Sequence, residues 1–385
     1  MPTEHSRQAG TVALATTALA RGGVWRHVED LALGLRASGV DVVIGLLPAA
    51  AELRAASERL GLRWEPLGRS VGRHVGIWHA HLHDTYDRRI LAALARRRAV
   101  GPSVVTEHLP RSPASDPSLE PHFRRTPGAR PAKTAFKRVQ VALADRTIAV
   151  SESSGRFLRT RYGLSGRSLR VVANGVTVPE RAAGPALAGP PLELVSVGSL
   201  IRQKGPDVAL EAVRLARADV RLTFVGDGKE RSRLERLAAE MPAGRVRFAG
   251  WTDDVDRVLA RSDVFCMASR WESCPYGAIE AMTAGLPVVA SAVDGLDEMV
   301  AHGESGLLVP PDDPRALAAA LDELAARGRG VAAMGSAGHA RAAARYSLDR
   351  MLERTIAVYR EAEAARAPLL TRRLPVGRSA SSRAP

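Results

Sequence analysis

Two segments of this sequence share one order of features: a short apolar run, a loop that contains glycine, and then apolar residues at helical spacing. In the first segment, residues 12–16 precede Gly22 and Gly23, and a helical pattern follows as far as residue 35. In the second, residues 192–197 precede a loop at 198–205 and a helix that we expect to begin at Pro206. Repeated strand, turn and helix units favour parallel sheets covered by helices. The sequence therefore predicts an α/β chain of two Rossmann-like, doubly wound domains.

Composition narrows the class of protein. The 385 residues suffice for two domains, and the 45% apolar content includes no run of about 18 apolar residues that would predict a membrane span. Only four of the 55 basic residues are lysines, and the formal net charge is +14. Aromatic residues make up 4%, which is too few for stacking on single strands, so we predict no nucleic-acid partner. A basic surface would still attract anionic ligands and anionic membranes.

The two cysteines bear on location. Cys266 and Cys274 form no CxxC motif and no disulfide framework, which suits a reducing compartment. We expect a cytoplasmic protein, and peripheral association with the inner face of the membrane stays open.

Two carboxylates flank a predicted helix start within residues 270–294. Glu272 lies in the loop before the helix, which we expect to begin at Pro275, and Glu280 lies on its second turn. At 1.5 Å per helical residue the two acids stand roughly 8–12 Å apart, too far to share a proton. The unpaired N–H groups of the helix start lie between them and suit an anion. The order of carboxylate, amides and carboxylate fits a sugar, a diphosphate and a ribose.

The same stretch carries a family resemblance. Residues 272–290 read ESCPYGAIEAMTAGLPVVA and resemble the signature E-x-x-P-x-x-x-x-E-A-M-x-x-G-x-P-V-V-A of the family 4 retaining glycosyltransferases. The resemblance extends over most of residues 10–365 and implies a GT-B fold with an interdomain cleft. It implies transfer of a sugar from a nucleoside diphosphate to an acceptor hydroxyl, with retention at the anomeric carbon and without an obligate cofactor.

Domain limits follow from the resemblance together with composition. We expect an acceptor domain at 1–180, a linker at 181–190, a nucleotide-sugar donor domain at 191–345, a helix at 346–365 that crosses back to the first domain, and a disordered basic tail at 366–385.

Site residues are carried over position by position. The resemblance places His108, at the end of the strand that begins at residue 103, near the reacting sugar. It places Lys204, together with Arg202, at the diphosphate, and these two residues join His108 and Glu272 as the predicted catalytic set. A lysine at 204 is informative in a chain that uses arginine for most basic positions, because it indicates a need for a compact charge. The full predicted donor site is Gly22, Gly23, Arg202, Lys204, Trp251, Thr252, Glu272, Ser273, Cys274, Pro275, Tyr276, Gly277 and Glu280.

This sequence departs from the family at Ser199, where the family often has arginine. The positive charge beside the diphosphate must then come from Arg202 or Lys204.

Three alternating histidines, His79, His81 and His83, support a competing hypothesis of a metal-dependent hydrolase. The family commonly carries such a run without metal, so we predict no metal site. Asp254 and Asp256 form a D-x-D motif, but we expect them to start a helix. A second alternative is a non-catalytic nucleotide-sugar binding protein.

The sequence leaves the substrates open. The donor base, the donor sugar and the acceptor, whether a glycan, a lipid or a natural product, are not readable. The loop at 109–133, rich in Pro and Ser, is expected on the acceptor side but has no pattern that identifies a ligand.

Overall fold

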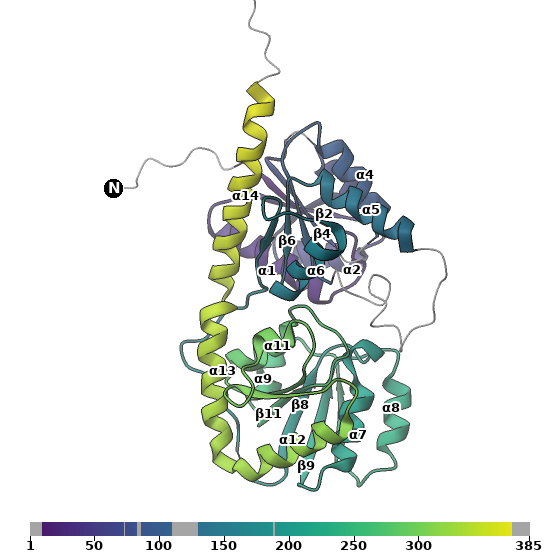
Figure 1. Ribbon diagram of the computed structural model, residues 1–385, viewed down its shortest axis with the longest axis vertical. Helices are drawn as coiled ribbons and strands as arrows, with labels where there is room; N and C mark the ends of the chain where they lie inside the picture. The colour runs from purple at the N-terminus through teal and green to yellow at the C-terminus, as the bar shows by residue number, and fades with distance from the viewer. Residues whose placement is uncertain (1–9, 73, 83–85, 110–129, 188, 372–385) are drawn as a thin grey trace, which may run out of the picture.

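The computed structural model describes residues 10–72, 74–82, 86–109, 130–187 and 189–371 (Figure 1). Its strands fall into two sheets, one in each half of the chain. The first sheet contains β1 (Val12–Thr16), β2 (Val42–Leu46), β3 (Arg63–Pro66), β4 (Ile77–Leu82), β5 (Ser103–Glu107), β6 (Arg146–Ala149) and β7 (Leu169–Val171). The second contains β8 (Leu192–Val197), β9 (Val220–Val225), β10 (Val246–Gly250), β11 (Val264–Met267), β12 (Val288–Ser291) and β13 (Gly306–Val309).

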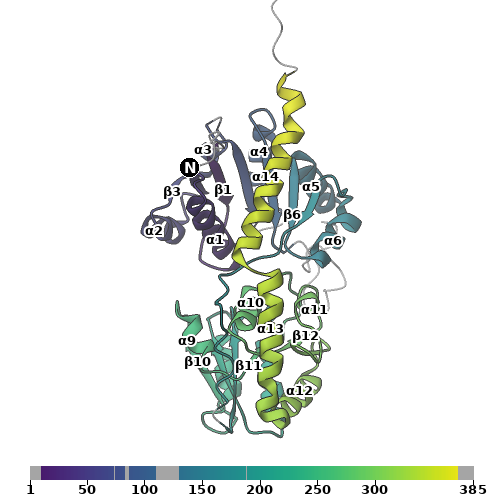
Figure 2. The same cartoon turned by 90° about the vertical axis from the view of Figure 1, so that its left-hand side faces the viewer.

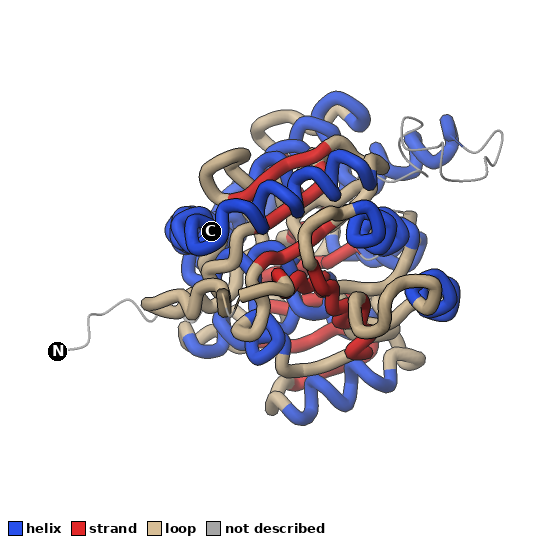
Figure 3. Tube along the Cα trace, turned by 90° about the horizontal axis from the view of Figure 1, so that it is seen from below, coloured by secondary structure: helices blue, strands red, loops and turns tan. Residues whose placement is uncertain are grey.

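Helices cover both sheets, with the strands in the middle and the helices outside (Figure 3). Those of the first half are α1 (Gly23–Ala37), α2 (Ala51–Arg59), α3 (Leu67–Ser70), α4 (Arg88–Arg97), α5 (Arg130–Leu143) and α6 (Glu152–Tyr162). Those of the second half are the 3₁₀ turns η2 (Arg202–Lys204) and η3 (Gly328–Gly330), with α7 (Pro206–Leu215), α8 (Arg231–Ala238), α9 (Val255–Leu259), α10 (Tyr276–Thr283), α11 (Leu296–Met299), α12 (Pro314–Arg327), α13 (Val331–Arg345) and α14 (Leu348–Thr371).

Strand order positions the site. The sheets run β3-β2-β1-β4-β5-β6-β7 and β10-β9-β8-β11-β12-β13, and every registered strand pair is parallel. This confirms the predicted fold of two Rossmann-like domains. The order reverses between β1 and β4 and again between β8 and β11, and loops that diverge at such points leave a crevice beyond the carboxyl ends of the strands.

Helices α13 and α14 run along one side of both domains and join them (Figure 2). Close packing holds α14 against the first domain, since a Cβ on Gly34 of α1 would stand 2.3 Å from the side chain of Leu352. Helix α14 continues to Thr371, past the end predicted at residue 365. Arg366, predicted to lie in a disordered tail, instead forms an ion pair of 2.6 Å with Asp145. The predicted start of the tail at residue 366 is wrong, because the guanidinium of Arg366 binds the carboxylate of Asp145 in the first domain.

The remaining domain limits stay predictions. The predicted linker at 181–190 falls between β7 and β8, and residues 1–9 and 372–385 lie outside the described residues. Within the described part of the chain, none of the helices combines the length and apolarity needed to cross a membrane.

Candidate functional site

The two crevices meet in a cleft with two joined compartments. The histidine compartment, about 660 Å³, is bordered by the β1–α1 loop, His108, Asn174, Lys204 and the loop before α10. The tryptophan compartment, about 480 Å³, is bordered by the same glycine loop, Trp251, the end of β9 and the first turns of α10. Both compartments share Lys204, Pro275 and Tyr276, so one elongated ligand would fit across them.

A tight loop between β8 and α7 brings Lys204 into the cleft. Gly205 ends this loop with φ of 61°, and a Cβ there would stand 1.9 Å from the carbonyl oxygen of Ala268. Only glycine accommodates both the left-handed backbone and this contact. The loop is thereby pressed onto the end of β11, where Glu272 follows.

Lys204 and Glu272 form the charged centre of the cleft. The Lys204 ammonium lies 2.5 Å from Oε1 of Glu272, and Ser269 donates its hydroxyl to the same oxygen at 2.9 Å. The Lys204 side chain keeps about a quarter of its surface exposed, whereas Glu272 is almost fully buried. The buried acid thus fixes a cation that still reaches the cleft.

Arg270 ties together the loops that surround Lys204. Its guanidinium binds both oxygens of Asp207 at 2.9 Å and donates to the carbonyl of Arg202 at 2.6 Å. It also contacts Asp312 at 2.7 Å, and its side chain is only 7% exposed. Asp312 adopts a left-handed φ of 57°, which is strained for a non-glycine residue. Arg270 therefore holds η2 in the place from which Lys204 reaches the cleft.

Helix α10 begins one residue later than predicted, because Pro275 has an extended ψ of 125° and is the N-cap. No side chain caps this helix start, which therefore presents backbone donors to the cleft. The Tyr276 hydroxyl is buried and has no hydrogen-bond partner among the described residues. It borders both compartments and is a polar group available to a ligand.

Glu280 lies in the tryptophan compartment, opposite α1 of the first domain. Burial raises the pKa of Glu280, and the positive charge of Arg26 works in the opposite direction. Arg26 itself pairs with Asp30 at 2.8 Å. A carboxylate held in partly buried surroundings is suited to accept hydrogen bonds from ligand hydroxyls.

A cluster of buried histidines lies behind the first-domain wall of the cleft. His27, His79 and His81 are at most 2% exposed. Burial lowers the pKa of His27 to about 4, despite a hydrogen bond with Asn174, and lowers the pKa of His81 well below its ordinary value. His108 completes the cluster, with Nε2 3.4 Å from Nδ1 of His81. Of these groups, His108 and Asn174 border the histidine compartment, and the buried rings lie behind them.

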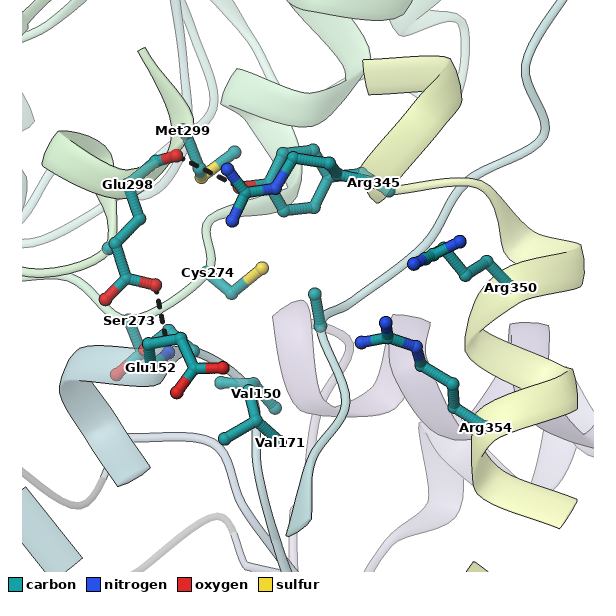
Figure 4. A pocket seen from close by; sticks show the side chains of 14 residues that line it. Val150, Glu152, Val171, Ser273, Cys274, Glu298, Met299, Arg345, Arg350 and Arg354 are labelled. Carbon is teal, nitrogen blue, oxygen red and sulfur yellow. Dashed lines mark hydrogen bonds between the residues drawn. The ribbon is translucent and has the colours of Figure 1, made fainter. Parts of the chain in front are cut away.

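A further pocket of about 280 Å³ is lined by residues of both domains (Figure 4). Glu298 of α11 accepts hydrogen bonds from the backbone N–H groups of Glu152, at 2.9 Å, and Ser153, at 2.5 Å. A carboxylate of one domain thus caps helix α6 of the other. Ser273 and Cys274 border both this pocket and the histidine compartment. Burial raises the pKa of Cys274 to about 12, so its thiol is unreactive at neutral pH.

Most of the predicted site residues line the cleft. His108 and the predicted donor residues other than Arg202 border one or both compartments. Arg202 borders neither, and its role stays a prediction. The sequence analysis missed Asn174 and Gln203, which border the histidine compartment, and His27, which contacts Asn174. It included Tyr276 but assigned no role to its hydroxyl. A partial signal existed for Asn174, in the turn that begins with Asn and Gly.

The structure also bears on the two metal motifs that the sequence contains, the three alternating histidines and the D-x-D motif. Both ring nitrogens of His79 have partners, the hydroxyls of Tyr359 at 2.8 Å and Thr106 at 2.7 Å. His83 lies outside the described residues, as does most of the 109–133 loop. Asp254 is the N-cap of α9 and accepts from the backbone N–H of Arg257 at 3.1 Å, which confirms the predicted helix start.

Family comparisons agree with this architecture. The family model described as Glycosyltransferase Family 4 matches residues 21–179, and the one described as Glycosyl transferases group 1 matches residues 191–327. Together they cover the two walls of the cleft.

Curated relatives are glycosyltransferases. The chain is 31% identical over 334 residues to the phosphatidyl-myo-inositol mannosyltransferase of Mycolicibacterium smegmatis, a match that covers 78% of this chain and 80% of the relative. It is 36% identical over 167 residues to the lipopolysaccharide core biosynthesis glycosyltransferase LpsE of Rhizobium meliloti, covering 42% of this chain and 48% of the relative. The chain thus matches about half the length of LpsE.

Solved structures share the fold. The Anabaena protein HepE, crystallised with UDP, has a TM-score of 0.73 at 20% identity, over 90% of this chain and 99% of HepE. Sucrose-phosphate synthase of Thermosynechococcus elongatus has a TM-score of 0.70 at 21% identity, over 92% of this chain and all of the synthase chain.

Proposed function

The chain belongs to the family 4, group 1 glycosyltransferases of GT-B fold, and from this premise we propose that it moves a sugar from a nucleoside diphosphate to an acceptor hydroxyl with retention at the anomeric carbon. The observation that carries the proposal is the Lys204–Glu272 pair, which lies at 2.5 Å beside the uncapped start of α10.

Departure of the diphosphate is the main electrostatic task of such a reaction. Negative charge grows on the leaving phosphate oxygens, and fixed donors aimed at that point lower the barrier. Lys204 and the first N–H groups of α10 supply such donors from two elements that converge on the cleft. The donor would replace the Lys204–Glu272 contact, with phosphate on the lysine and sugar hydroxyls on the glutamate. Glu280 would accept the ribose hydroxyls.

We propose that this chemistry needs no metal ion, because the protein itself supplies the positive charge at the diphosphate. Arg202 remains a candidate for additional charge, from η2. His108 would donate or accept a hydrogen bond near the donor sugar rather than act as a committed base.

UDP-glucose is the first donor to test. HepE has been crystallised with UDP and with UDP-glucose, and its fold covers 90% of this chain. The acceptor class stays open among glycans, lipids and natural products. The net charge of +14 supports peripheral association with anionic membranes.

A thermal-shift panel of UDP, GDP, ADP and dTDP sugars tests the donor site. A ligand at 100 times its dissociation constant adds about 2.7 kcal/mol to stability. We expect one nucleotide class to stabilise the wild type and to lose most of this effect in Glu280→Ala and Lys204→Met. If no sugar nucleotide shifts the wild type, the proposal is overturned.

A second experiment separates an enzyme from a non-catalytic binding protein. The stabilising donor is incubated with acceptor pools from glycan, lipid and small-molecule fractions, and release of the free nucleoside diphosphate is followed. Release together with an α-linked product from an α-linked donor, assigned by NMR, supports retention, and a β-linked product contradicts it. Donor binding without acceptor-stimulated release from any pool would support the binding protein instead.

A further inference from the structure

Four of the ten histidines of the chain, His27, His79, His81 and His108, gather below the cleft. They come from α1, β4 and the end of β5. His79 uses both ring nitrogens within the protein, on Tyr359 and Thr106. The other three each offer one ring nitrogen, and these three atoms lie within 4.8 Å of one another. The three rings therefore converge on one point.

The separation of two of these nitrogens matches metal geometry. Nδ1 of His81 and Nε2 of His108 are 3.4 Å apart. Two imidazole nitrogens bound tetrahedrally to Zn²⁺ at 2.0–2.1 Å stand about 3.4 Å from each other. The ring centroid of His27 lies 5.1 Å from that of His81 and 4.8 Å from that of His108. The three ligand nitrogens lie within 4.8 Å of one another, so an ion between the rings requires them to draw closer together.

The orientation of His27 is fixed by a second layer of contacts. Asn174 donates its Nδ2 to the carbonyl of Cys274 at 2.7 Å, which identifies Oδ1 as the atom 3.0 Å from Nδ1 of His27. Nδ1 must then carry the proton, and the lone pair of His27 is on Nε2. Histidines that bind metals are held in this way, by a carbonyl or carboxylate on the second nitrogen.

The cluster also leaves one atom unsatisfied. Nε2 of His81, the second nitrogen of the ring whose Nδ1 faces His108, is buried and has no hydrogen-bond partner among the described residues, so contacts within the described part of the protein do not account for this ring. Histidines kept only for packing usually pair their buried nitrogens within the protein. His108 and Asn174 border the histidine compartment, so an ion among the rings would be reached from the cleft.

We propose that His27, His81 and His108 form a binding site for a divalent transition metal ion, with Zn²⁺ the best fit. Imidazole nitrogens suit Zn²⁺, Ni²⁺ and Cu²⁺ rather than Mg²⁺ or Ca²⁺. Three protein ligands leave a fourth position for water, facing the cleft. The ion is an inhibitor and not a cofactor, because it withdraws His108 from the sugar nucleotide; this consequence rests on the proposed function.

Calorimetric titration of the metal-stripped full chain with Zn²⁺ tests the site. We expect one ion per chain. His27→Gln and His81→Gln should each weaken binding by more than about 100-fold, and Asn174→Ser by about 10–100-fold, as loss of an outer contact does. His74→Gln is the matched control, since this histidine is more than half exposed and lies 3.4 Å from Glu65, and it should bind Zn²⁺ as the wild type does.

Cobalt supplies a second readout that does not depend on activity. Co²⁺ in the site should give the visible absorption bands of a tetrahedral nitrogen-bound ion, absent from the two histidine variants. Thermal unfolding without metal checks that the variants fold. A wild type that takes up no Zn²⁺, or histidine variants that bind Zn²⁺ as tightly as the wild type, overturns the proposal.

The inhibitory role is tested separately by UDP binding. The Zn²⁺-loaded chain should bind UDP-glucose at least about 10-fold more weakly than the metal-stripped chain, a coupling of ordinary size. Equal affinities would overturn the inhibition and leave the metal site standing. If the metal-stripped chain binds no sugar nucleotide, the donor assignment fails while the Zn²⁺ titration still decides the site.

Discussion

The two sides of the cleft differ in their charge. The wall from the second domain holds charge: Lys204 and Glu272 face each other at 2.5 Å, and Arg270 fixes their loops. Behind the wall from the first domain lie buried histidines with a lowered pKa, which carry no charge at neutral pH. Under the proposed function, a leaving diphosphate needs fixed positive charge. The charged wall would then stabilise the diphosphate, and the histidine side would lie beside the acceptor.

The largest expected effect comes from removing the charge of Lys204, which the proposed function places at the diphosphate. Lys204→Met should lower kcat by about 100-fold or more, as loss of one transition-state donor does. Steady-state kinetics with the stabilising donor measures the change. Lys229→Met is the control, since that lysine is exposed and borders neither compartment, and it should leave kcat unchanged. An unchanged kcat in Lys204→Met would show that Lys204 does not stabilise the transition state.

The next largest effect is the loss of stability on removing Arg270, which supports the loops of the charged wall. Arg270→Met leaves Asp207 and Asp312 without their shared cation and should cost about 3 kcal/mol of stability. Denaturant unfolding measures it. The matched control is Arg217→Met, which breaks an ion pair with Asp322 whose arginine is 89% exposed and should cost at most about 1 kcal/mol. Equal costs for the two variants would show that Arg270 is not a structural support.

Glu280 should lower the stability of the fold at neutral pH and raise the affinity for the nucleotide. Its raised pKa means that the ionised carboxylate costs folding free energy at neutral pH, a cost that disappears as pH falls below the ordinary value of 4.5. Glu280→Gln should therefore unfold at a higher temperature than the wild type at pH 7, with the difference lost in acid. It should also bind the nucleotide roughly 10-fold more weakly, because a charged acceptor is lost.

Glu211→Gln is the control for both effects, the change in stability and the change in nucleotide affinity. The hydrogen bond from Arg214 lowers the pKa of Glu211, so the variant should gain no stability at pH 7. It lies outside both compartments and should keep its nucleotide affinity. A Glu280→Gln variant that behaves like this control would contradict a ligand role for Glu280.

The smallest expected effect is at the contact between the two walls. Arg21 lies 3.0 Å from Asp253 and 5.2 Å from the ring centre of Trp251, across the opening of the tryptophan compartment. Arg21→Ala removes an exposed pair worth less than about 1 kcal/mol, so nucleotide affinity should change only about 2–4-fold. Isothermal titration with UDP measures this change. A loss of affinity above about 10-fold would mean that the first domain also supplies positive charge to the nucleotide.

Short-range features of the chain were predictable. The strands, the glycine turns and the stretch from Glu272 to Glu280 follow from apolar runs and from the backbone limits of Gly and Pro, which act within a few residues. The end of α14 was misplaced because Arg366 is held by Asp145, far away in the sequence.

What the sequence by itself determined is the order of elements, the doubly wound class and the layout of the stretch from Glu272 to Glu280, since each depends on neighbours along the chain. The histidine cluster and the support by Arg270 were decided by tertiary structure. His27 and Asn174 are 147 positions apart, and Asn174 and Cys274 are 100 apart. Such pairs meet only when the strand order has brought β1 beside β4 and the two domains together, and no local pattern carries that information.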